Sequence, residues 1–357
     1  MLTRRNLLAA VTASLPAAAG FAASPKKPLR YLQIGVGHAH ANKIEVYAES
    51  GDWEVVGIVE EDPGLQREAK NNPLYQPFKF FSLEEALNLP NLDVIGVETR
   101  VRDLLRYAAL AIDRGCHVHL DKPAGADFAE YQKLMAAADA KGLVVQMGYM
   151  YRFNPAVQLL HRMLKAGWLG DVFETHAVMS KLMPPADRKV VAEFPGGTMF
   201  ELGCHIIDLT VGVLGKPDRV QSHTRRVFAS ENDTLSDNML AVFEYPGATA
   251  TVRSTALEVE GFGRRHFTVC GTEGTVHIQP LDRPVLKVSL SRERRFDGEE
   301  YLYPRGTSEV RFEPPYVRYV GDAADLAATV RGDKGNSYPS SHDLAVHDAV
   351  LAAAAML

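Results

Sequence analysis

The sequence predicts an α/β domain with a doubly wound parallel sheet, followed by an α/β domain built on a large, mostly antiparallel sheet. Short apolar runs alternate with longer helical stretches from Leu29 to Met147, which is typical of a parallel sheet wrapped by helices. Six segments with strand-like alternation follow between residues 172 and 291, separated by turn residues. Such a run favours an antiparallel sheet. The length of 357 residues is enough for both domains.

The first 24 residues are interpreted as an export signal rather than as part of either domain. Arg4 and Arg5 precede 17 uncharged residues, from Leu7 to Ala23, that include Pro16. This stretch is too short and too rich in alanine for a membrane span. It resembles a twin-arginine signal, which implies a periplasmic protein with no stable membrane insertion after cleavage; an uncleaved N-terminal anchor is the alternative. Loss of Arg4 and Arg5 changes the formal charge from −5 to −7.

The elements of the first domain, residues 27–148, follow from short apolar runs and from helix-end signals. Strands are expected at 29–35, 54–60, 94–98, 117–120 and 144–147, and helices at 39–50, 102–114 and 128–141. Ser82 and Glu85 form a capping box for a further short helix. Gly115 and Gly142 are expected to end the two helices that precede them.

The second domain, residues 149–357, begins with a helix. Asn154-Pro155 is a helix start, and the helix is expected to run to about Ala166. Strands are then expected at 172–179, 219–228, 239–245, 248–257, 264–279 and 285–291. We expect this sheet to mediate homo-oligomerisation.

A glycine loop follows the first strand directly and reads Gly35-Val36-Gly37-His38-Ala39-His40. Gly35 allows a tight turn, and Gly37 allows a pyrophosphate to approach the backbone at the N-terminus of the next helix. We therefore predict cofactor contacts at Gly35, Gly37, His38 and Ala39. The third position of the dinucleotide fingerprint is His40 rather than Gly or Ala, and the alternative is a glycine turn that binds nothing.

The second strand ends at Glu60, 23 residues after Gly37. An acid at this place accepts hydrogen bonds from the hydroxyls of an adenosine ribose. Glu61 and Asp62 add negative charge, and no Arg or Lys is adjacent in sequence to neutralise a 2′-phosphate. The sequence therefore favours NAD over NADP.

Two further motifs carry candidate catalytic groups. Asp121-Lys122-Pro123 ends a predicted strand, where Lys122 would point toward a nicotinamide and donate to a substrate hydroxyl. Glu201, His205 and Asp208 lie at positions i, i+4 and i+7 of a predicted helix, and therefore on one face. A carboxylate beside an imidazole provides an oriented general base. A solvated Glu–His pair is the alternative.

Together these motifs resemble the glucose–fructose oxidoreductase/inositol dehydrogenase/rhizopine catabolism family of nicotinamide-dependent sugar oxidoreductases, over nearly the whole mature chain. Asp121-Lys122-Pro123 is similar to the family's Glu-Lys-Pro motif, and Glu201-x-x-x-His205 is similar to its Asp-x-x-x-His element. The resemblance implies that Lys122 and His205 act in catalysis and that Glu201 supports His205. It also implies that Gly35, Gly37 and Glu60 lie at the cofactor.

Two other segments extend or limit the resemblance. Residues 149–155 resemble the family's crossing between domains, and with the predicted helix they supply our candidate substrate contacts, Tyr149, Tyr151, Arg152 and Asp208. The family's Thr-Pro-Asn-like loop is replaced here by Glu98-Thr99-Arg100-Val101-Arg102-Asp103. We expect Thr99 and Asp121 to contact the cofactor. Arg100 and Arg102 either bind a carboxylate or phosphate or are solvated residues at a helix start.

Several classes of site are not expected. The net charge of −5 and the lack of long basic runs argue against nucleic-acid binding. Cys116, Cys204 and Cys270 form neither a CxxC pair nor an even set. The pairs His38/His40 and His117/His119 have no neighbouring acid or cysteine in sequence that completes a ligand set, and no metal site is expected.

Three functions remain in competition. The first is oxidation or reduction of a sugar or polyol with a tightly bound NAD. The second is NAD-dependent glycoside cleavage through transient oxidation of the sugar ring. The third is a non-catalytic binding protein on the same fold, against which the presence of both Lys122 and His205 argues. Neither the substrate nor the direction of reaction follows from the sequence.

Overall fold

The structure is a computed structural model that describes residues 10–13, 26–228 and 233–357. Most of the predicted export signal, including Arg4 and Arg5, lies outside the described residues. Its described part, Ala10–Ala13, forms strand β1 of the second sheet, which differs from the expectation that the first 24 residues belong to neither domain. The chain divides into two compact units. Of the described residues, the parallel-sheet unit contains 26–150 and 318–348, and the antiparallel-sheet unit contains 10–13, 151–228, 233–317 and 349–357.

The parallel-sheet unit is built on six strands in the order β4-β3-β2-β5-β6-β7, all parallel. The strands are β2 (Leu29–Ile34), β3 (Trp53–Val59), β4 (Phe80–Phe81), β5 (Val94–Val97), β6 (His117–Leu120) and β7 (Val145–Met147). This arrangement confirms the predicted doubly wound sheet. The chain order reverses between β2 and β5, and in such sheets ligands bind at the carboxyl ends of the strands beside this reversal.

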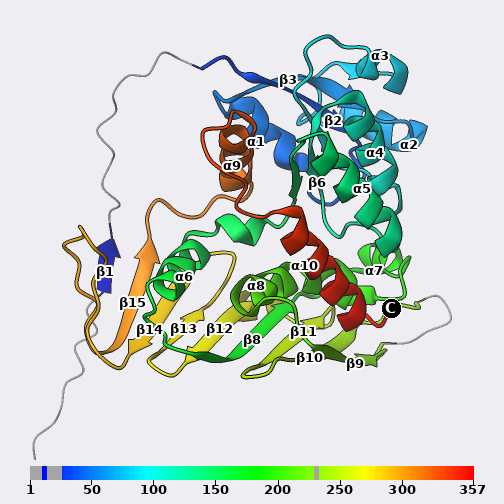
Figure 1. The fold of residues 1–357 in the computed structure, drawn as a ribbon. Coiled ribbons are helices and arrows are strands. Elements are labelled where there is room, and N and C mark those ends of the chain that lie inside the picture. Colours follow the sequence, from blue (N-terminus) through cyan, green and yellow to red (C-terminus); the bar gives the residue numbers. More distant parts are fainter. Residues whose placement is uncertain (1–9, 14–25, 229–232) are drawn as a thin grey trace, which may run out of the picture. The chain divides into compact units, whose positions relative to one another are not determined.

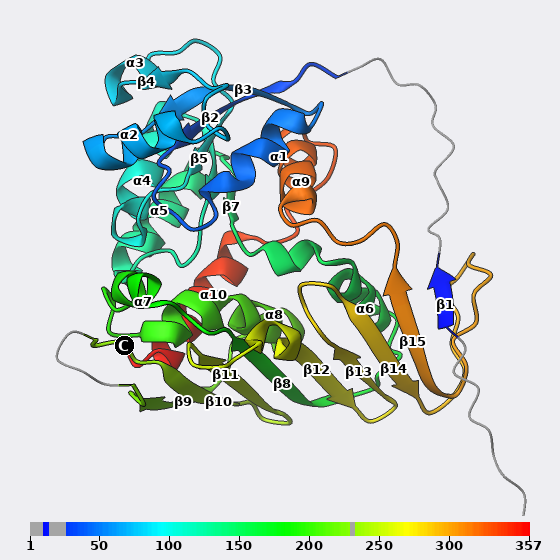
Figure 2. The same cartoon turned by 180° about the vertical axis from the view of Figure 1, so that it is seen from behind.

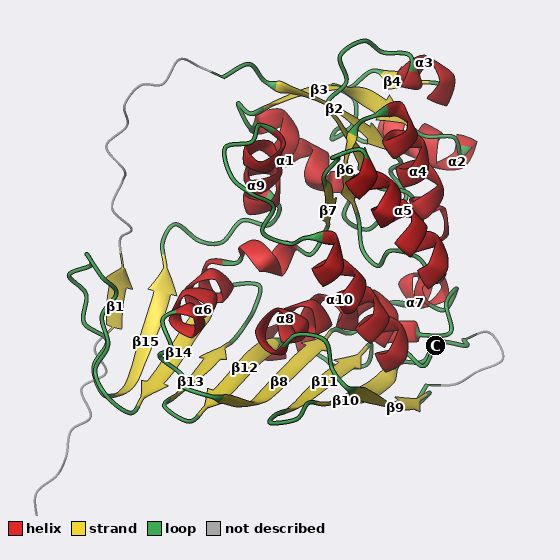
Figure 3. Ribbon diagram, in the orientation of Figure 1, coloured by secondary structure: helices red, strands yellow, loops and turns green. Residues whose placement is uncertain are grey.

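Helices cover both faces of this sheet, as Figure 3 shows. They are α1 (Ile44–Glu49), α2 (Pro63–Asn71), α3 (Leu83–Leu87), α4 (Leu104–Arg114), α5 (Phe128–Ala140) and α9 (Val320–Val330). The capping box is confirmed, because Ser82 and Glu85 each accept the other's backbone N–H. Gly115 ends α4 with a φ of +84°, as a left-handed helix end requires. The sequence analysis did not predict α2.

Helix α9 reaches the core of the parallel-sheet unit from near the end of the chain. Its Leu326 packs in one buried cluster with Tyr31, Tyr47 and Trp53. The rings of Tyr31 and Tyr47 stack at 4.2 Å between centroids. Residues 318–348 therefore pack with the parallel sheet, although they follow the second sheet in sequence.

The antiparallel-sheet unit contains a nine-stranded sheet in the order β1-β15-β14-β13-β12-β8-β11-β10-β9. Only the β1–β15 and β8–β11 pairs are parallel, so the predicted, mostly antiparallel sheet is confirmed. The strands are β1 (Ala10–Ala13), β8 (Val172–Ser180), β9 (Arg219–Arg225), β10 (Asn238–Glu244), β11 (Thr249–Thr255), β12 (His266–Gly271), β13 (Gly274–Ile278), β14 (Val285–Leu290) and β15 (Gly306–Phe312).

Two helices of this unit lie on the same face of the sheet in both Figure 1 and Figure 2, namely α6 (Pro155–Lys165) and α8 (Cys204–Leu214). The side chain of Asn154 caps α6 by accepting the N–H groups of Ala156 and Val157, as expected. Helix α7 (Pro185–Val191) also belongs to this unit, and α10 (Ser340–Ala353) contains the boundary between the units. The segment expected as one strand at 264–279 is a hairpin, β12–β13.

Among the described residues, every helix is too short or too polar to cross a bilayer.

Candidate active site

The glycine loop leads from β2 into a short helical turn, Ala41–Lys43, and then into α1. Gly35 has a φ of +94°, and a Cβ there would lie 2.6 Å from the Thr99 backbone nitrogen. A Cβ at Gly37 would lie 3.0 Å from Leu65 Cδ1 and 3.3 Å from Arg100 Cγ. Gly35 therefore requires glycine in this conformation, whereas a Cβ at Gly37 would need the Leu65 and Arg100 side chains to shift slightly. A ligand that approaches either glycine meets bare backbone.

Glu60 follows β3 and lies against this loop. Its Oε2 accepts the N–H of Val36 at 2.9 Å, and its Oε1 accepts the N–H of Asp62 at 2.9 Å. Each carboxylate oxygen can accept a further hydrogen bond. The Glu60 carboxylate can therefore accept hydrogen bonds from the ribose hydroxyls of a dinucleotide, and the exposed backbone of the glycine loop beside it can approach the phosphates.

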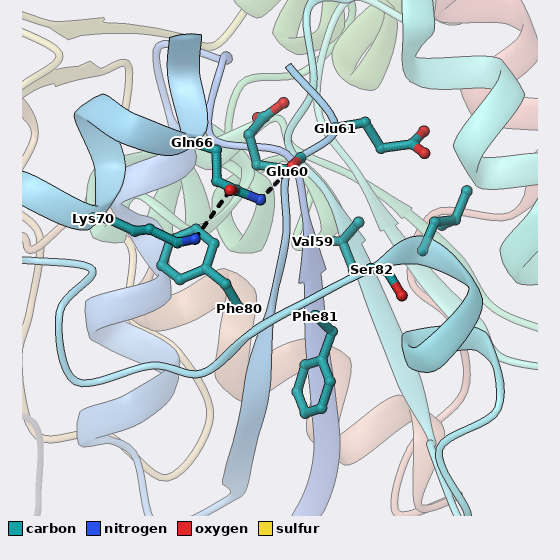
Figure 4. A pocket seen from close by; sticks show the side chains of 9 residues that line it. Val59, Glu60, Glu61, Gln66, Lys70, Phe80, Phe81 and Ser82 are labelled. Atoms are coloured by element: carbon teal, nitrogen blue, oxygen red, sulfur yellow. Dashed lines mark hydrogen bonds between the residues drawn. The ribbon is translucent and has the colours of Figure 1, made fainter. Parts of the chain in front are cut away.

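A cavity of about 350 Å³ opens beside Glu60. Lys70, Gln66 and the backbone of Glu60 form a chain of hydrogen bonds along this cavity (Figure 4). Lys70 Nζ donates to Gln66 Oε1 at 3.0 Å, and Gln66 Nε2 donates to the Glu60 carbonyl at 3.1 Å. The Lys70 ammonium also lies 5.4 Å from the centre of the Phe80 ring. The cavity is lined by Val59, Glu60, Glu61, Gln66, Lys70, Phe80, Phe81, Ser82 and Leu83.

Two arginine side chains lie beside the acidic residues Glu61 and Asp62, although no basic residue is adjacent to these acids in sequence. Arg100 Nη2 lies 3.3 Å from Asp62 Oδ2, and Arg106 Nη2 lies 3.7 Å from Glu61 Oε2. Tyr107 Oη donates to the same Glu61 oxygen at 2.5 Å. The sequence analysis considered Arg100 as a ligand for a carboxylate, and it lies beside that of Asp62. It missed Arg106, Tyr107 and Lys70, because they come from α4 and α2 rather than from adjacent positions.

Lys122 follows β6 and is buried, with 1% of its surface exposed. Its N–H donates to Asp121 Oδ1 at 2.7 Å. Its carbonyl oxygen lies 3.0 Å from His38 Nε2. His38, predicted as a cofactor contact, is thus bonded to the backbone of the predicted catalytic lysine.

A buried cluster of polar side chains surrounds the ammonium group of Lys43. The Lys43 Nζ lies 2.9 Å from Glu98 Oε1 and 2.7 Å from His119 Nε2, and it donates to Asp121 Oδ2. All four residues are at most 1% exposed. His119 Nδ1 bonds the Oε1 of Gln146 at 2.9 Å, so its Nε2 is an acceptor for Lys43.

The electrostatics of this cluster set its charges. Burial lowers the pKa of His119 to about 3, so its ring is neutral. Burial and the Asp121 charge raise the pKa of Glu98 well above its usual value. Burial also opposes the charge on Asp121, but His38 and Lys43 outweigh it and hold the pKa of Asp121 well below its usual value. Asp121 is therefore the carboxylate of this cluster that most strongly favours the charged form, and it forms an ion pair with Lys43.

Two groups of potential metal ligands lie in this cluster, His38 with His40 and Asp121, and Glu98 with His119 and Asp121. This corrects the sequence analysis for the His38/His40 pair, which Asp121 completes as a possible three-ligand group; of the second pair only His119 takes part. The expectation that no metal is bound stays a prediction. The carboxylates were missed because they follow β5 and β6, whose ends meet at one edge of the sheet. The second group already surrounds the Lys43 ammonium, and in the first group His38 Nδ1 accepts the N–H of His40 at 3.2 Å.

Glu201 and His205 lie in the antiparallel-sheet unit, where a π-helical turn, Met199–Gly203, runs directly into α8. The sequence analysis predicted a regular helix here. His205 is 2% exposed, and its ring lies 5.6 Å from that of Tyr151 in an edge-to-face arrangement. Single π-helical turns are frequent at functional sites, so the turn is an independent sign that this segment has a function.

Two predicted substrate contacts of this unit are bonded to each other. The guanidinium group of Arg152 donates to Asp208 through Nε at 3.0 Å and through Nη2 at 2.6 Å. Both side chains are at most 2% exposed. Tyr151 Oη donates to Asp282 Oδ1 at 2.9 Å. Any substrate at these residues would therefore meet a network that is already bonded.

The predicted residues fall into two sets. The parallel-sheet unit brings together at the carboxyl ends of its strands Gly35, Gly37, His38, Glu60, Thr99, Asp121, Lys122 and Tyr149, with Ala39 exposed beside them. Thr99 Oγ1 donates to the Arg100 carbonyl at 3.2 Å. The antiparallel-sheet unit holds Tyr151, Arg152, Glu201, His205 and Asp208.

Two family models match the chain. Residues 29–149 match the oxidoreductase family with an NAD-binding Rossmann fold. Residues 157–277 match the GFO/IDH/MocA C-terminal domain. Together the two matches cover more than half of the chain, the whole parallel sheet and most strands of the second sheet.

Individual proteins are similar to this chain in sequence or in fold. The trans-1,2-dihydrobenzene-1,2-diol dehydrogenase of Sus scrofa is 27% identical over 276 residues, which are 75% of this chain and 80% of that protein. A solved oxidoreductase from Agrobacterium radiobacter, in complex with NAD+, L-tartaric acid and magnesium, has a TM-score of 0.75 at 15% identity, covering 92% of this chain and 97% of that chain. The WlbA dehydrogenase from Bordetella pertussis, in complex with NADH and UDP-GlcNAcA, has a TM-score of 0.71 at 18% identity, covering 92% and 97%. The chain therefore belongs to the GFO/IDH/MocA family of NAD-binding oxidoreductases, the family that its motifs resemble.

Proposed function

We propose that this protein uses a tightly bound NAD to oxidise or reduce a hydroxyl or keto group of a sugar, polyol or related compound. The observation that carries the proposal is the Glu60 carboxylate, bonded to Val36 within the glycine loop at 2.9 Å and bordering a cavity of about 350 Å³. This arrangement supports binding of the adenosine end of a dinucleotide beside the cavity.

The choice of NAD over NADP rests on the same carboxylate. A 2′-phosphate at the ribose would bring a negative charge against Glu60, whose oxygens are already committed to two backbone N–H groups and cannot move away without breaking them. Arg100 and Arg106 lie near Asp62 and Glu61, and their charges are offset by these carboxylates. Lys70 also lines the cavity, where its ammonium group donates to Gln66. The preference for an uncharged ribose therefore rests on the Glu60 carboxylate.

When NAD is held at Gly35, Gly37 and Glu60, its nicotinamide would supply the hydride acceptor or donor for the substrate carbon. His205 takes the hydroxyl proton as general base. Lys122 donates a hydrogen bond to the same oxygen and stabilises its developing negative charge. Glu201 supports the imidazole of His205, and the name of the Sus scrofa relative, a diol dehydrogenase, is in keeping with a hydroxyl substrate.

The test is an anaerobic assay of a panel of sugars and polyols, in which NADH absorbance and release of reducing sugar are followed together. A change in absorbance with a matching carbonyl product supports the proposal. Release of reducing sugar with no net absorbance change would replace it by NAD-dependent glycoside cleavage. Protein that binds no NAD(H) at millimolar concentration would favour the non-catalytic alternative.

We further propose that the chain is exported by the twin-arginine route and acts in the periplasm. The basis is Arg4-Arg5 before the uncharged stretch from Leu7 to Ala23. Because that route moves folded proteins, the cofactor would be loaded before export and would have to stay bound. Fractionation of cells that express the chain with Arg4→Lys and Arg5→Lys should find the variant protein retained in the cytoplasm, and unchanged export would contradict the proposal.

We also propose a homo-oligomer formed through the nine-stranded sheet. Helices α6 and α8 lie on one face of this sheet, while alternate residues of β10 are only partly buried. Light scattering coupled to gel filtration tests the oligomer, and a charged substitution at the partly buried Val242 should dissociate it. A monomeric wild-type protein would refute this proposal.

A further inference from the structure

We propose that His38 is a positioning residue, which fixes the backbone of Lys122 and so aims the catalytic ammonium group, instead of contacting the cofactor as the glycine-loop motif suggests. The inference rests on the proposed role of Lys122. The carbonyl oxygen of Lys122 lies 3.0 Å from His38 Nε2, and its N–H donates to Asp121 Oδ1 at 2.7 Å. The backbone carbonyl and the backbone N–H of Lys122 are thus each held by a buried side chain, that of His38 and that of Asp121.

The chemistry of the Lys122 carbonyl sets the direction of its bond with His38. A carbonyl oxygen only accepts hydrogen bonds, so His38 Nε2 carries a proton and donates it to this oxygen. The N–H of His40 lies 3.2 Å from Nδ1, the other ring nitrogen. The glycine loop therefore contacts the ring on the nitrogen that does not face Lys122.

The partner on the other side is fixed as well. Lys43 Nζ donates to Asp121 Oδ2, which leaves Oδ1 for the Lys122 N–H and for His40 Nδ1 at 3.2 Å. Lys43 is in turn held by Glu98 and His119. Asp121 is fully buried, so its carboxylate cannot turn to solvent and release Lys122.

This arrangement joins the start of α1 to the end of β6. His38, His40 and Lys43 come from the glycine loop and the turn after it, whereas Asp121 and Lys122 follow β6. A small displacement of a reacting group costs as much as 10²-fold in rate. Loss of the His38 bond should therefore lower kcat and leave cofactor affinity nearly unchanged.

The test compares two amide side chains at one position. In His38→Gln the side-chain amide reaches the place of Nε2 and keeps a donor for the Lys122 carbonyl. In His38→Asn the amide reaches only the place of Nδ1 and cannot make that bond. The control is His117→Asn, which alters a histidine at the other end of β6 that accepts the N–H of Val144 at 2.9 Å.

We expect His38→Asn to lower kcat by about 10- to 100-fold, with KM and the Kd for NAD(H) within about twofold of wild type, and His38→Gln to restore most of kcat. An activity-independent readout is the rate of reductive methylation of the Lys122 amine, followed by mass spectrometry. This rate should rise several-fold in His38→Asn alone. Equal methylation rates in the Asn and Gln variants would overturn the positioning role, whether or not a substrate is turned over. Wild-type protein that turns over no substrate, with methylation rates as expected, would count against the proposed function only.

Discussion

Replacement of Asp208 by Asn should destabilise the protein by about 3–5 kcal/mol, because it removes the carboxylate charge that the buried Arg152 guanidinium group contacts. The two groups meet at 2.6–3.1 Å, and their side chains are 1% and 2% exposed. Unit charges about 3 Å apart attract each other by about 5 kcal/mol at an effective dielectric constant near 20. Asn keeps the shape and one hydrogen-bond acceptor, so the change removes mainly charge.

The assay is urea unfolding of the purified protein, followed by circular dichroism and tryptophan fluorescence. Glu299→Gln is the matched control, because it breaks an ion pair with Arg162 in the same unit whose side chains are 40% and 45% exposed; this pair should contribute at most about 1 kcal/mol. The double variant Arg152→Met/Asp208→Leu should recover most of the loss, since it leaves no buried charge. A loss below about 1 kcal/mol in Asp208→Asn, together with a raised KM, would refute the structural role and return Asp208 to the substrate.

Three other predictions concern catalysis, cofactor choice and pH. Lys122→Ala and His205→Ala should each lower kcat by about 10²–10⁴-fold with NAD(H) still bound. Glu201→Gln should lower kcat less. Near-normal turnover in His205→Ala would exclude His205 as the general base. Fluorescence titration should show at least about tenfold preference for NAD over NADP, since the hydrogen bonds between the acid and the ribose contribute about 1.5–3 kcal/mol. Glu60→Ala should lose this preference. Equal affinities in the wild type would contradict the placement of Glu60 at the ribose. Burial lowers the pKa of His347 from 6.5 to about 4. Its contribution to stability is therefore complete above pH 6.5 and is lost as the pH falls toward 4, by about 3 kcal/mol, and urea unfolding of His347→Gln should show a smaller fall.

The sequence predicted those features that depend on local signals or on strand order. The nearness of Glu60 to the glycine loop follows from adjacent parallel strands, whose carboxyl ends meet at one edge. The capping box at Ser82 and the helix end at Gly115 depend on residues within one turn. Such features need no knowledge of distant contacts, and each was predicted at the correct position.

The missed features depend on contacts between distant parts of the chain. Lys43 reads as a surface residue of a helix start, and only the folded sheet brings Glu98 and Asp121 around its ammonium group. The spacing of Arg152 and Asp208 in sequence gives no sign that they pair. The π-helical turn before His205 has no pattern distinct from that of a regular helix.

The contribution of α9 to the core beside Tyr31 has a consequence for biosynthesis. The first 150 residues leave the ribosome long before Val320–Val330 is made, so the nascent parallel sheet must wait with part of its apolar surface uncovered. Its core closes only when translation is nearly complete, which delays assembly of the glycine loop and the Lys43 cluster into their final form. An expressed fragment that stops near residue 150 should accordingly require a chaperone to remain in solution, and supplying the α9 segment as a separate peptide should relieve that requirement.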